Sequence, residues 1–310
     1  MVNKSVLKAD WLMLLAAVIW GGAFVAQRMG MAHVGPLTFT GVRFALGSLV
    51  LLPLALRPGK DARVKSGLPR LVASRPTLWG GLMAGAILFG GAVLQQIGLV
   101  HTTAGKAGFV TGLYVVIVPL LGLLLGHRVG LGGWLGTALA VVGLYLLSFT
   151  ERFSLAPGDL WVLVGAFFWA GHVLVLGWLS PRVNVVRLAC AQFAACSLFS
   201  LIGAALTEEI ALAGIIAAGI PILYGGLISV GVAYTLQVVA QRDSPPHHAA
   251  IILSMEAVFA VLAGFLLLGE TLTARSAAGC GLMLAGMLLV QLWPAGEAVA
   301  PRDDGQPAQA

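Results

Sequence analysis

Charged residues are scarce in this chain. Asp, Glu, Lys and Arg make up 10% of its 310 residues, whereas soluble domains carry about 25%. Hydrophobic residues account for 59%, and the mean hydropathy is +0.97. A chain of this length has too few polar side chains to cover a water-exposed surface. The composition therefore predicts an integral membrane protein, with no polar segment long enough for a separate soluble domain.

Residues and motifs that would support disulfides, metal binding or catalysis are also few. The three cysteines, Cys190, Cys196 and Cys280, lie in apolar runs without metal-ligand spacing, which argues against a disulfide framework or a metal site. The sequence contains no Walker A motif, no Gly-x-Ser-x-Gly elbow and no His-Glu-x-x-His pair. We therefore expect no enzymatic activity and no cofactor. The net charge of +6 resides mainly in loops between apolar runs, where it sets membrane orientation and does not indicate nucleic-acid binding.

Ten apolar segments approach the roughly 20 residues that a helix needs to cross a bilayer. They lie at 11–30, 36–56, 77–98, 104–126, 131–149, 159–179, 183–206, 217–240, 247–268 and 274–293. The connections between them contain Gly, Pro or charged residues. The sequence thus predicts an all-α membrane protein with ten transmembrane helices, preceded by a short segment at 1–9 and followed by a disordered tail at 294–310.

The positive residues predict the orientation of the chain. With a cytoplasmic N-terminus, 13 of the 18 Lys and Arg residues fall on the cytoplasmic side and four on the other, and Arg43 lies within a helix. Six of the 13 lie in the longest interior loop, 57–76. Because positive residues accumulate in cytoplasmic loops, both termini are predicted to be cytoplasmic.

Residues 10–150 and 157–293 are predicted to be two copies of one five-helix repeat. A shift of 149 residues places Trp20 on Trp169. A shift of 143 residues places Gly126, Gly136 and Gly143 on Gly269, Gly279 and Gly286. Because five is odd, the second copy enters the membrane from the opposite side. Inverted repeats around a central cavity are typical of carriers that alternate access, although an ancient duplication without mechanistic meaning would leave the same pattern.

Several short motifs follow one another along the chain. The first copy carries Trp20-Gly21-Gly22-Ala23-Phe24, Arg43-Phe44, Ala107 to Leu113 and Val118-Pro119-Leu120, and the second carries Ser254 to Val258, Leu268-Gly269-Glu270 and the glycines from Gly279 to Gly286. This set resembles the EamA-type branch of the drug/metabolite transporter superfamily. The resemblance implies a ten-helix bundle around a central cavity, with the fifth and tenth helices at the periphery. It also implies export, or less often uptake, of amino acids, amines, nucleosides or drugs. One departure is Gly126-His127, where the family usually has Gly-Glu.

Three ionisable residues inside predicted spans are the first functional candidates, because such groups are costly in a membrane and usually face the bundle interior. Glu256 is the only acid in the middle of a predicted span. It is a candidate for binding a cation or carrying a proton, or for a hydrogen bond to a neighbouring helix. Arg43 is a candidate for a substrate carboxylate, but we favour a structural role in which it pairs with a carboxylate or with carbonyl groups. His172 is the second proton-coupling candidate, with a satisfied structural hydrogen bond as the alternative.

Uncharged polar and aromatic residues complete the predicted cavity. Trp20, Phe24 and Gln27 share one helical face at positions i, i+4 and i+7. The remaining candidates are Gln95, Lys106, Thr111, Tyr114, Trp169, Tyr234 and Gln237. Amides and hydroxyls of this kind suit a neutral polar or zwitterionic solute. Interhelical hydrogen bonding and packing are the structural alternatives for each of them.

The pattern favours a secondary transporter, an exporter in our interpretation, that moves a small polar metabolite such as an amino acid or amine across the inner membrane. A multidrug, nucleoside or other metabolite permease of the same fold is the alternative. A passive channel and an intramembrane enzyme are alternatives of a different class. The expected partners are a small-molecule substrate, the lipid bilayer and protons as a candidate coupling ion, in a monomer or homodimer.

Overall fold

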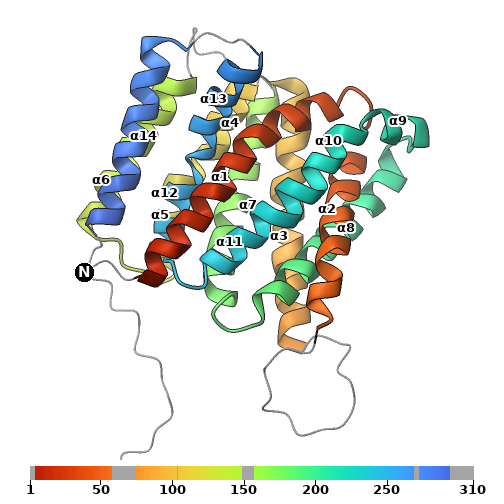
Figure 1. The fold of residues 1–310 in the computed structure, drawn as a ribbon, viewed down its shortest axis with the longest axis horizontal. Helices are drawn as coiled ribbons and strands as arrows, with labels where there is room; N and C mark the ends of the chain where they lie inside the picture. The colour runs from red at the N-terminus through yellow and green to blue at the C-terminus, as the bar shows by residue number, and fades with distance from the viewer. Residues whose placement is uncertain (1–3, 58–74, 103, 149–156, 269–271, 294–310) are drawn as a thin grey trace, which may run out of the picture.

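The computed structural model describes residues 4–57, 75–102, 104–148, 157–268 and 272–293, and these residues form helices and short connections without a strand. The helices are α1 Lys4–Gly30, α2 Pro36–Ala55, α3 Arg75–His101, α4 Ala104–Gly112, α5 Tyr114–Leu124, α6 Leu131–Ser148, α7 Pro157–Leu179, α8 Val185–Thr207, α9 Leu212–Ala217, α10 Gly219–Leu223, η1 Tyr224–Tyr234, α11 Thr235–Ala240, α12 Pro246–Leu253, α13 Glu256–Leu268 and α14 Ala274–Leu292. Figure 1 shows them packed side by side as a bundle. The predicted tail at 294–310 lies outside the described residues.

The described residues contain nine helical segments that are long and apolar enough to cross a membrane, and a shorter apolar helix at Leu131–Leu147. Together they confirm the ten predicted spans. The outer surface is apolar, as lipid contact requires: Leu124, Leu206 and Ile220 are each at least 80% exposed.

Three spans predicted as single helices are subdivided. The span at 104–126 breaks at Leu113, between α4 and α5, and the span at 247–268 breaks at Ser254 and Met255, between α12 and α13. In the span at 217–240, a π-helix of 11 residues, η1, lies between α10 and α11. Non-α segments of this kind inside spans occur where the backbone lines a cavity or a functional site.

Helix boundaries follow ordinary terminal chemistry in several places. Pro36, Pro157 and Pro246 each occupy the first position of their helix, where a missing N–H costs nothing. After α5, Gly126 adopts φ 81°, and the His127 N–H donates to the carbonyl of Gly122 at 2.9 Å. A left-handed residue followed by this bond is a Schellman ending, which favours glycine.

One sequence-based expectation about a helix start is wrong. Asp10 comes directly before the first predicted span, 11–30, a position that predicts an N-cap, but α1 already begins at Lys4. The buried Asp10 carboxylate instead contacts His248 Nε2 of α12 at 2.9 Å and accepts a hydrogen bond from Gln291 of α14 at 3.1 Å. It therefore joins three helices.

At the other end of α1, a side chain from a distant loop caps α2. Glu208, which follows α8, accepts hydrogen bonds from the N–H groups of Leu37 and Thr38 at 2.8 Å each, and from the Thr38 hydroxyl at 2.7 Å. This carboxylate satisfies free donors at the N-terminus of α2 and lies favourably in the helix dipole. It ties the α1–α2 connection to the α8–α9 connection.

Helices α6 and α14 lie together at one edge of the bundle (Figure 1), at the periphery that the family resemblance implies. A Cβ atom on Gly143 would lie 2.6 Å from the carbonyl oxygen of Gly279, and one on Gly279 would lie 2.7 Å from that of Gly143. Gly136 and Gly286 face each other in the same reciprocal way, at 2.9 and 2.7 Å. The two helices are therefore antiparallel and in backbone contact, which only glycine permits.

Candidate functional site

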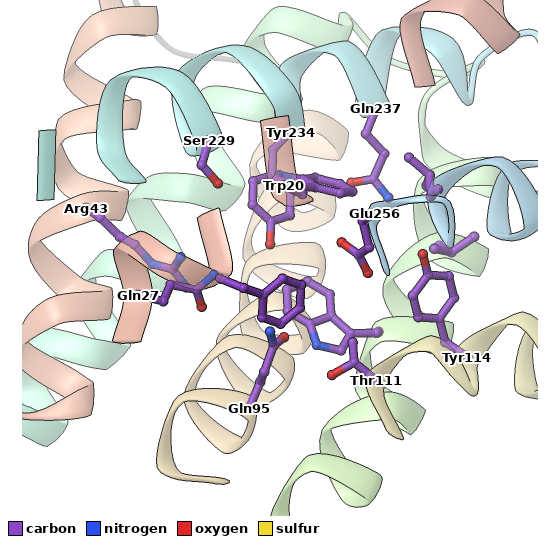
Figure 2. Close-up of a pocket in the computed structure, with 14 residues that line it drawn as sticks. Trp20, Gln27, Arg43, Gln95, Thr111, Tyr114, Ser229, Tyr234, Gln237 and Glu256 are labelled. Carbon is purple, nitrogen blue, oxygen red and sulfur yellow. The ribbon is translucent and has the colours of Figure 1, made fainter. Parts of the chain in front are cut away.

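A cavity lies inside the bundle (Figure 2), and ten helical elements contribute to its wall. Its lining residues are Trp20, Phe24, Gln27, Arg43, Gln95, Thr111, Tyr114, Trp169, Val173, Ser229, Tyr234, Gln237, Leu253 and Glu256. Seven of these precede residue 150 and seven follow it. Both predicted halves of the chain thus contribute equally to one chamber.

Eleven of the 13 candidate residues named from the sequence line this cavity. His172 does not line it, and the side chain of Lys106 lies outside the part of the chain whose side chains are described. The sequence reasoning missed Val173 and Leu253 as lining residues, because an apolar wall residue looks like any other residue of an apolar span. Ser229 lies in the same predicted span as the candidates Tyr234 and Gln237, so its hydroxyl was a detectable signal.

Arg43 projects from α2 into the cavity and is 2% exposed. Its guanidinium carbon lies 5.5 Å from the ring centroid of Phe39 and 5.1 Å from that of Phe44, within cation–π range. Its Nε atom has no hydrogen-bond partner, and no carboxylate of the described residues lies within 4.0 Å of the guanidinium. The structural pairing that we favoured for Arg43 is therefore absent from the described part of the chain.

The equivalent position in the second half has a different environment. The 149-residue shift places Arg43 on Gln192, and Ala23 on His172. Gln192 and His172 are both fully buried and form a hydrogen bond of 2.9 Å between Oε1 and Nε2. The second half thus fills this position with a mutually bonded polar pair behind the cavity wall. The first half has an arginine there and no counterpart to His172.

Glu256 is the first residue of α13 and is 9% exposed. It lines the cavity, and among the described residues its carboxylate has no hydrogen-bond or ion-pair partner. The break at Ser254 and Met255 brings the N-terminus of α13 to this point. Free N–H groups and the positive end of the helix dipole favour a carboxylate there, so the interrupted span explains how an acid is accommodated inside the bundle.

Aromatic side chains form the centre of the cavity around Tyr234. The Tyr234 and Trp20 rings lie 4.5 Å apart at 53°, and the Trp169 ring is stacked on Tyr234 at 6.1 Å and 20°. Such offset and tilted ring pairs are energetically favourable. The indole nitrogens of both tryptophans are buried without a hydrogen-bond partner. The two residues that overlay in the repeat alignment thus lie against one tyrosine.

The π-helix η1 supplies Ser229 and Tyr234 to the wall of this chamber. In Figure 2 both hydroxyl groups point toward the interior. A π-helix winds more widely than an α-helix and is frequent at functional sites. The pattern of apolar residues at 217–240 gave no sign of it.

Taken with the ten spans, the interior cavity with its polar and aromatic lining defines a multi-pass membrane protein with an interior candidate binding site. Comparison with known proteins identifies the class more closely: the model of the EamA-like transporter family matches residues 7–149 and again residues 156–292. The chain belongs to the EamA-like transporter family and is a multi-pass membrane transporter.

Similar proteins carry the same kind of description. A protein of Archaeoglobus fulgidus named "Uncharacterized transporter" is 31% identical over 290 residues, which cover 92% of this chain and 86% of that protein. The Escherichia coli K12 protein named "Uncharacterized inner membrane transporter YedA" is 29% identical over 300 residues, with 92% of each chain covered. One solved crystal structure matches with a TM-score of 0.73 at 20% identity, covering 92% of this chain and 96% of that chain, and it supports the fold alone.

Proposed function

We propose that this transporter is a secondary carrier that exports a small polar metabolite, such as an amino acid or amine, across the inner membrane by alternating access. The observation that carries the proposal is the central cavity with two buried, unpartnered ionic side chains, Arg43 and Glu256. Leaving a charge buried and unpaired is costly, so such groups are retained where a ligand, ion or proton satisfies them.

Features of the backbone support a rocking motion between two inverted halves. The family model matches the chain twice, once in each half. The broken spans are equivalent, since the 143-residue shift places Leu113, at the first break, on Glu256, next to the second. The reciprocal glycine contacts between α6 and α14 have the pattern that a two-fold relation between the halves would generate.

Of the two proton-coupling candidates, Glu256 fits the role better, because its carboxylate faces the cavity while His172 is bonded to Gln192 behind the wall. The inner-membrane location and cytoplasmic termini are part of the same proposal. The location is supported by the printed name of the Escherichia coli relative and the termini by the distribution of Lys and Arg. A monomer or a homodimer is the predicted oligomeric state of the carrier.

Reconstitution into liposomes tests the proposal. Liposomes that contain the purified protein are loaded with unlabelled amino acids or amines. Uptake of the same solute in labelled form from outside is then followed as counterflow. Saturable uptake that is accelerated by internal substrate supports a carrier. A conductance that does not saturate identifies a channel, and the absence of flux with any amino acid or amine contradicts the proposal.

Coupling is tested in the same vesicles. With an imposed proton gradient, Glu256→Gln should abolish the stimulation of flux by the gradient, whereas His172→Gln should retain it. Stimulation that survives in Glu256→Gln would refute the role of this carboxylate in proton coupling.

A further inference from the structure

The two ionic groups of the cavity lie at separate places in its wall. Arg43 projects from α2 and Glu256 from the start of α13, and Figure 2 shows Trp20 and Tyr234 between them. They form no ion pair with each other, because no guanidinium nitrogen of Arg43 lies within 4.0 Å of a carboxylate oxygen of Glu256. The cavity therefore has a basic end and an acidic end with aromatic rings between the two.

Neither ionic group is paired with an opposite charge among the described residues. Arg43 has aromatic neighbours but no carboxylate, and Glu256 has no hydrogen-bond partner. The equivalent positions in the other half are Gln192, which is bonded to His172, and the apolar Leu113. Because a fold built from two similar halves accommodates uncharged residues at both equivalent positions, the charges are not needed for packing there. Each half instead contributes one charge, and the two are of opposite sign.

The middle of the chamber is suited to an uncharged spacer. Tyr234 lies between Trp20 and Trp169, at ring distances of 4.5 and 6.1 Å. Val173 and Leu253 add an apolar wall. Flat rings and aliphatic side chains bind methylene groups or a ring of a ligand through burial of apolar surface.

We infer that the preferred ligand is an elongated zwitterion, with its anionic group at Arg43, its ammonium group at Glu256 and an apolar spacer against the aromatic residues. This inference rests on the proposed function, because it names the substrate class of the same site. An α-amino acid carries both charged groups on one carbon, whereas an elongated zwitterion can place one charged group at each of the two ionic residues. A planar guanidinium is well suited to bind a carboxylate through two parallel hydrogen bonds.

Thermal stabilisation of the full chain in detergent tests the inference through binding alone. The ligands are glycine, 4-aminobutanoate and 6-aminohexanoate, in which the charges are progressively farther apart, with butylamine and butanoate as singly charged controls. We expect at least one of the two longer zwitterions to bind at least tenfold more tightly than glycine and than either singly charged control. Equal affinity for glycine and for the longer zwitterions would overturn the inference.

Two variants assign the ends of the ligand. In Arg43→Gln the preference for the zwitterion over butylamine should disappear, and in Glu256→Gln the preference over butanoate should disappear. Arg43→Lys retains the charge but not the two-pronged geometry, and should keep part of the preference if Arg43→Gln is poorly folded. Arg28→Gln and Glu209→Gln are matched controls, because both residues are exposed and outside the cavity. A preference that is unchanged in both cavity variants would overturn the inference.

The proposed transport function is measured separately, by counterflow in liposomes. Tight binding of a long zwitterion without flux would support the ligand class and contradict transport. Flux of α-amino acids or simple amines, without any preference for separated charges, would support transport and overturn the ligand class.

Discussion

Replacement of Glu208 by alanine removes the carboxylate that caps α2 from the α8–α9 connection. Three donors lose their acceptor: the N–H groups of Leu37 and Thr38 and the Thr38 hydroxyl, at 2.8, 2.8 and 2.7 Å. Loss of an N-terminal cap costs about 1 kcal/mol, and hydrogen bonds to a charged group contribute about 1.5 to 3 kcal/mol when buried. Glu208 is only partly buried, so water replaces part of this interaction. We therefore expect Glu208→Ala to lower the free energy of unfolding by about 2 kcal/mol.

The measurement is reversible unfolding in mixed micelles, followed by helix content. Glu208→Gln keeps one acceptor oxygen and should lose about half as much, about 1 kcal/mol. Glu209→Ala is the matched control, because the neighbouring acid is exposed, and its expected change is below about 0.5 kcal/mol. Equal stability of Glu208→Ala and Glu209→Ala would refute the argument that the distant carboxylate stabilises the start of α2.

The remaining predictions concern the contact between α6 and α14, the buried pair of Asp10 and His248, and the aromatic centre of the cavity. Gly143→Ala places a methyl group against the carbonyl of Gly279 and should lower the free energy of unfolding by about 1 to 3 kcal/mol. In the control Gly281→Ala the methyl group enters open space, so the free energy of unfolding should stay the same or rise by up to about 1 kcal/mol. A similar loss of stability in both variants would contradict the backbone contact between α6 and α14. A double-mutant cycle of Asp10→Asn and His248→Gln, measured by the same unfolding assay, should give a coupling energy of about 1 to 3 kcal/mol. Additive effects of the two substitutions would show that the 2.9 Å contact contributes nothing to the free energy of unfolding. Tyr234→Ala should weaken ligand binding at least tenfold while Tyr234→Phe retains most of it, measured by ligand-induced thermal stabilisation; equal loss in both would assign the effect to the hydroxyl and not to the ring.

The spans and most of the cavity were predictable from the sequence for one physical reason. In an apolar run, a polar side chain usually faces the interior, so residues such as Gln27 and Glu256 indicated the cavity without knowledge of the packing. The ten spans followed from the length of the apolar segments, and nine of them meet the length criterion in the described part of the chain, with Leu131–Leu147 as the shorter tenth.

Features that depend on contacts between distant segments were not predictable. The π-helix at Tyr224–Tyr234 has an ordinary apolar sequence, and Glu208 looks like any acid in a solvated loop. Asp10 was misassigned because a carboxylate near a helix start is usually a cap, and its partner His248 is 238 residues away. The environment of Arg43 also required the structure, since the sequence cannot show which of many groups lies beside a buried guanidinium.

The glycine contacts between α6 and α14 also limit which parts of the molecule can slide. The two pairs, Gly136 with Gly286 and Gly143 with Gly279, are seven residues apart along each helix, so the backbones touch over about 10 Å. A displacement along the helix axis by half a turn would drive larger side chains into these glycine gaps. We therefore expect α6 and α14 to keep their mutual register and to move as one unit in any rearrangement that opens the cavity.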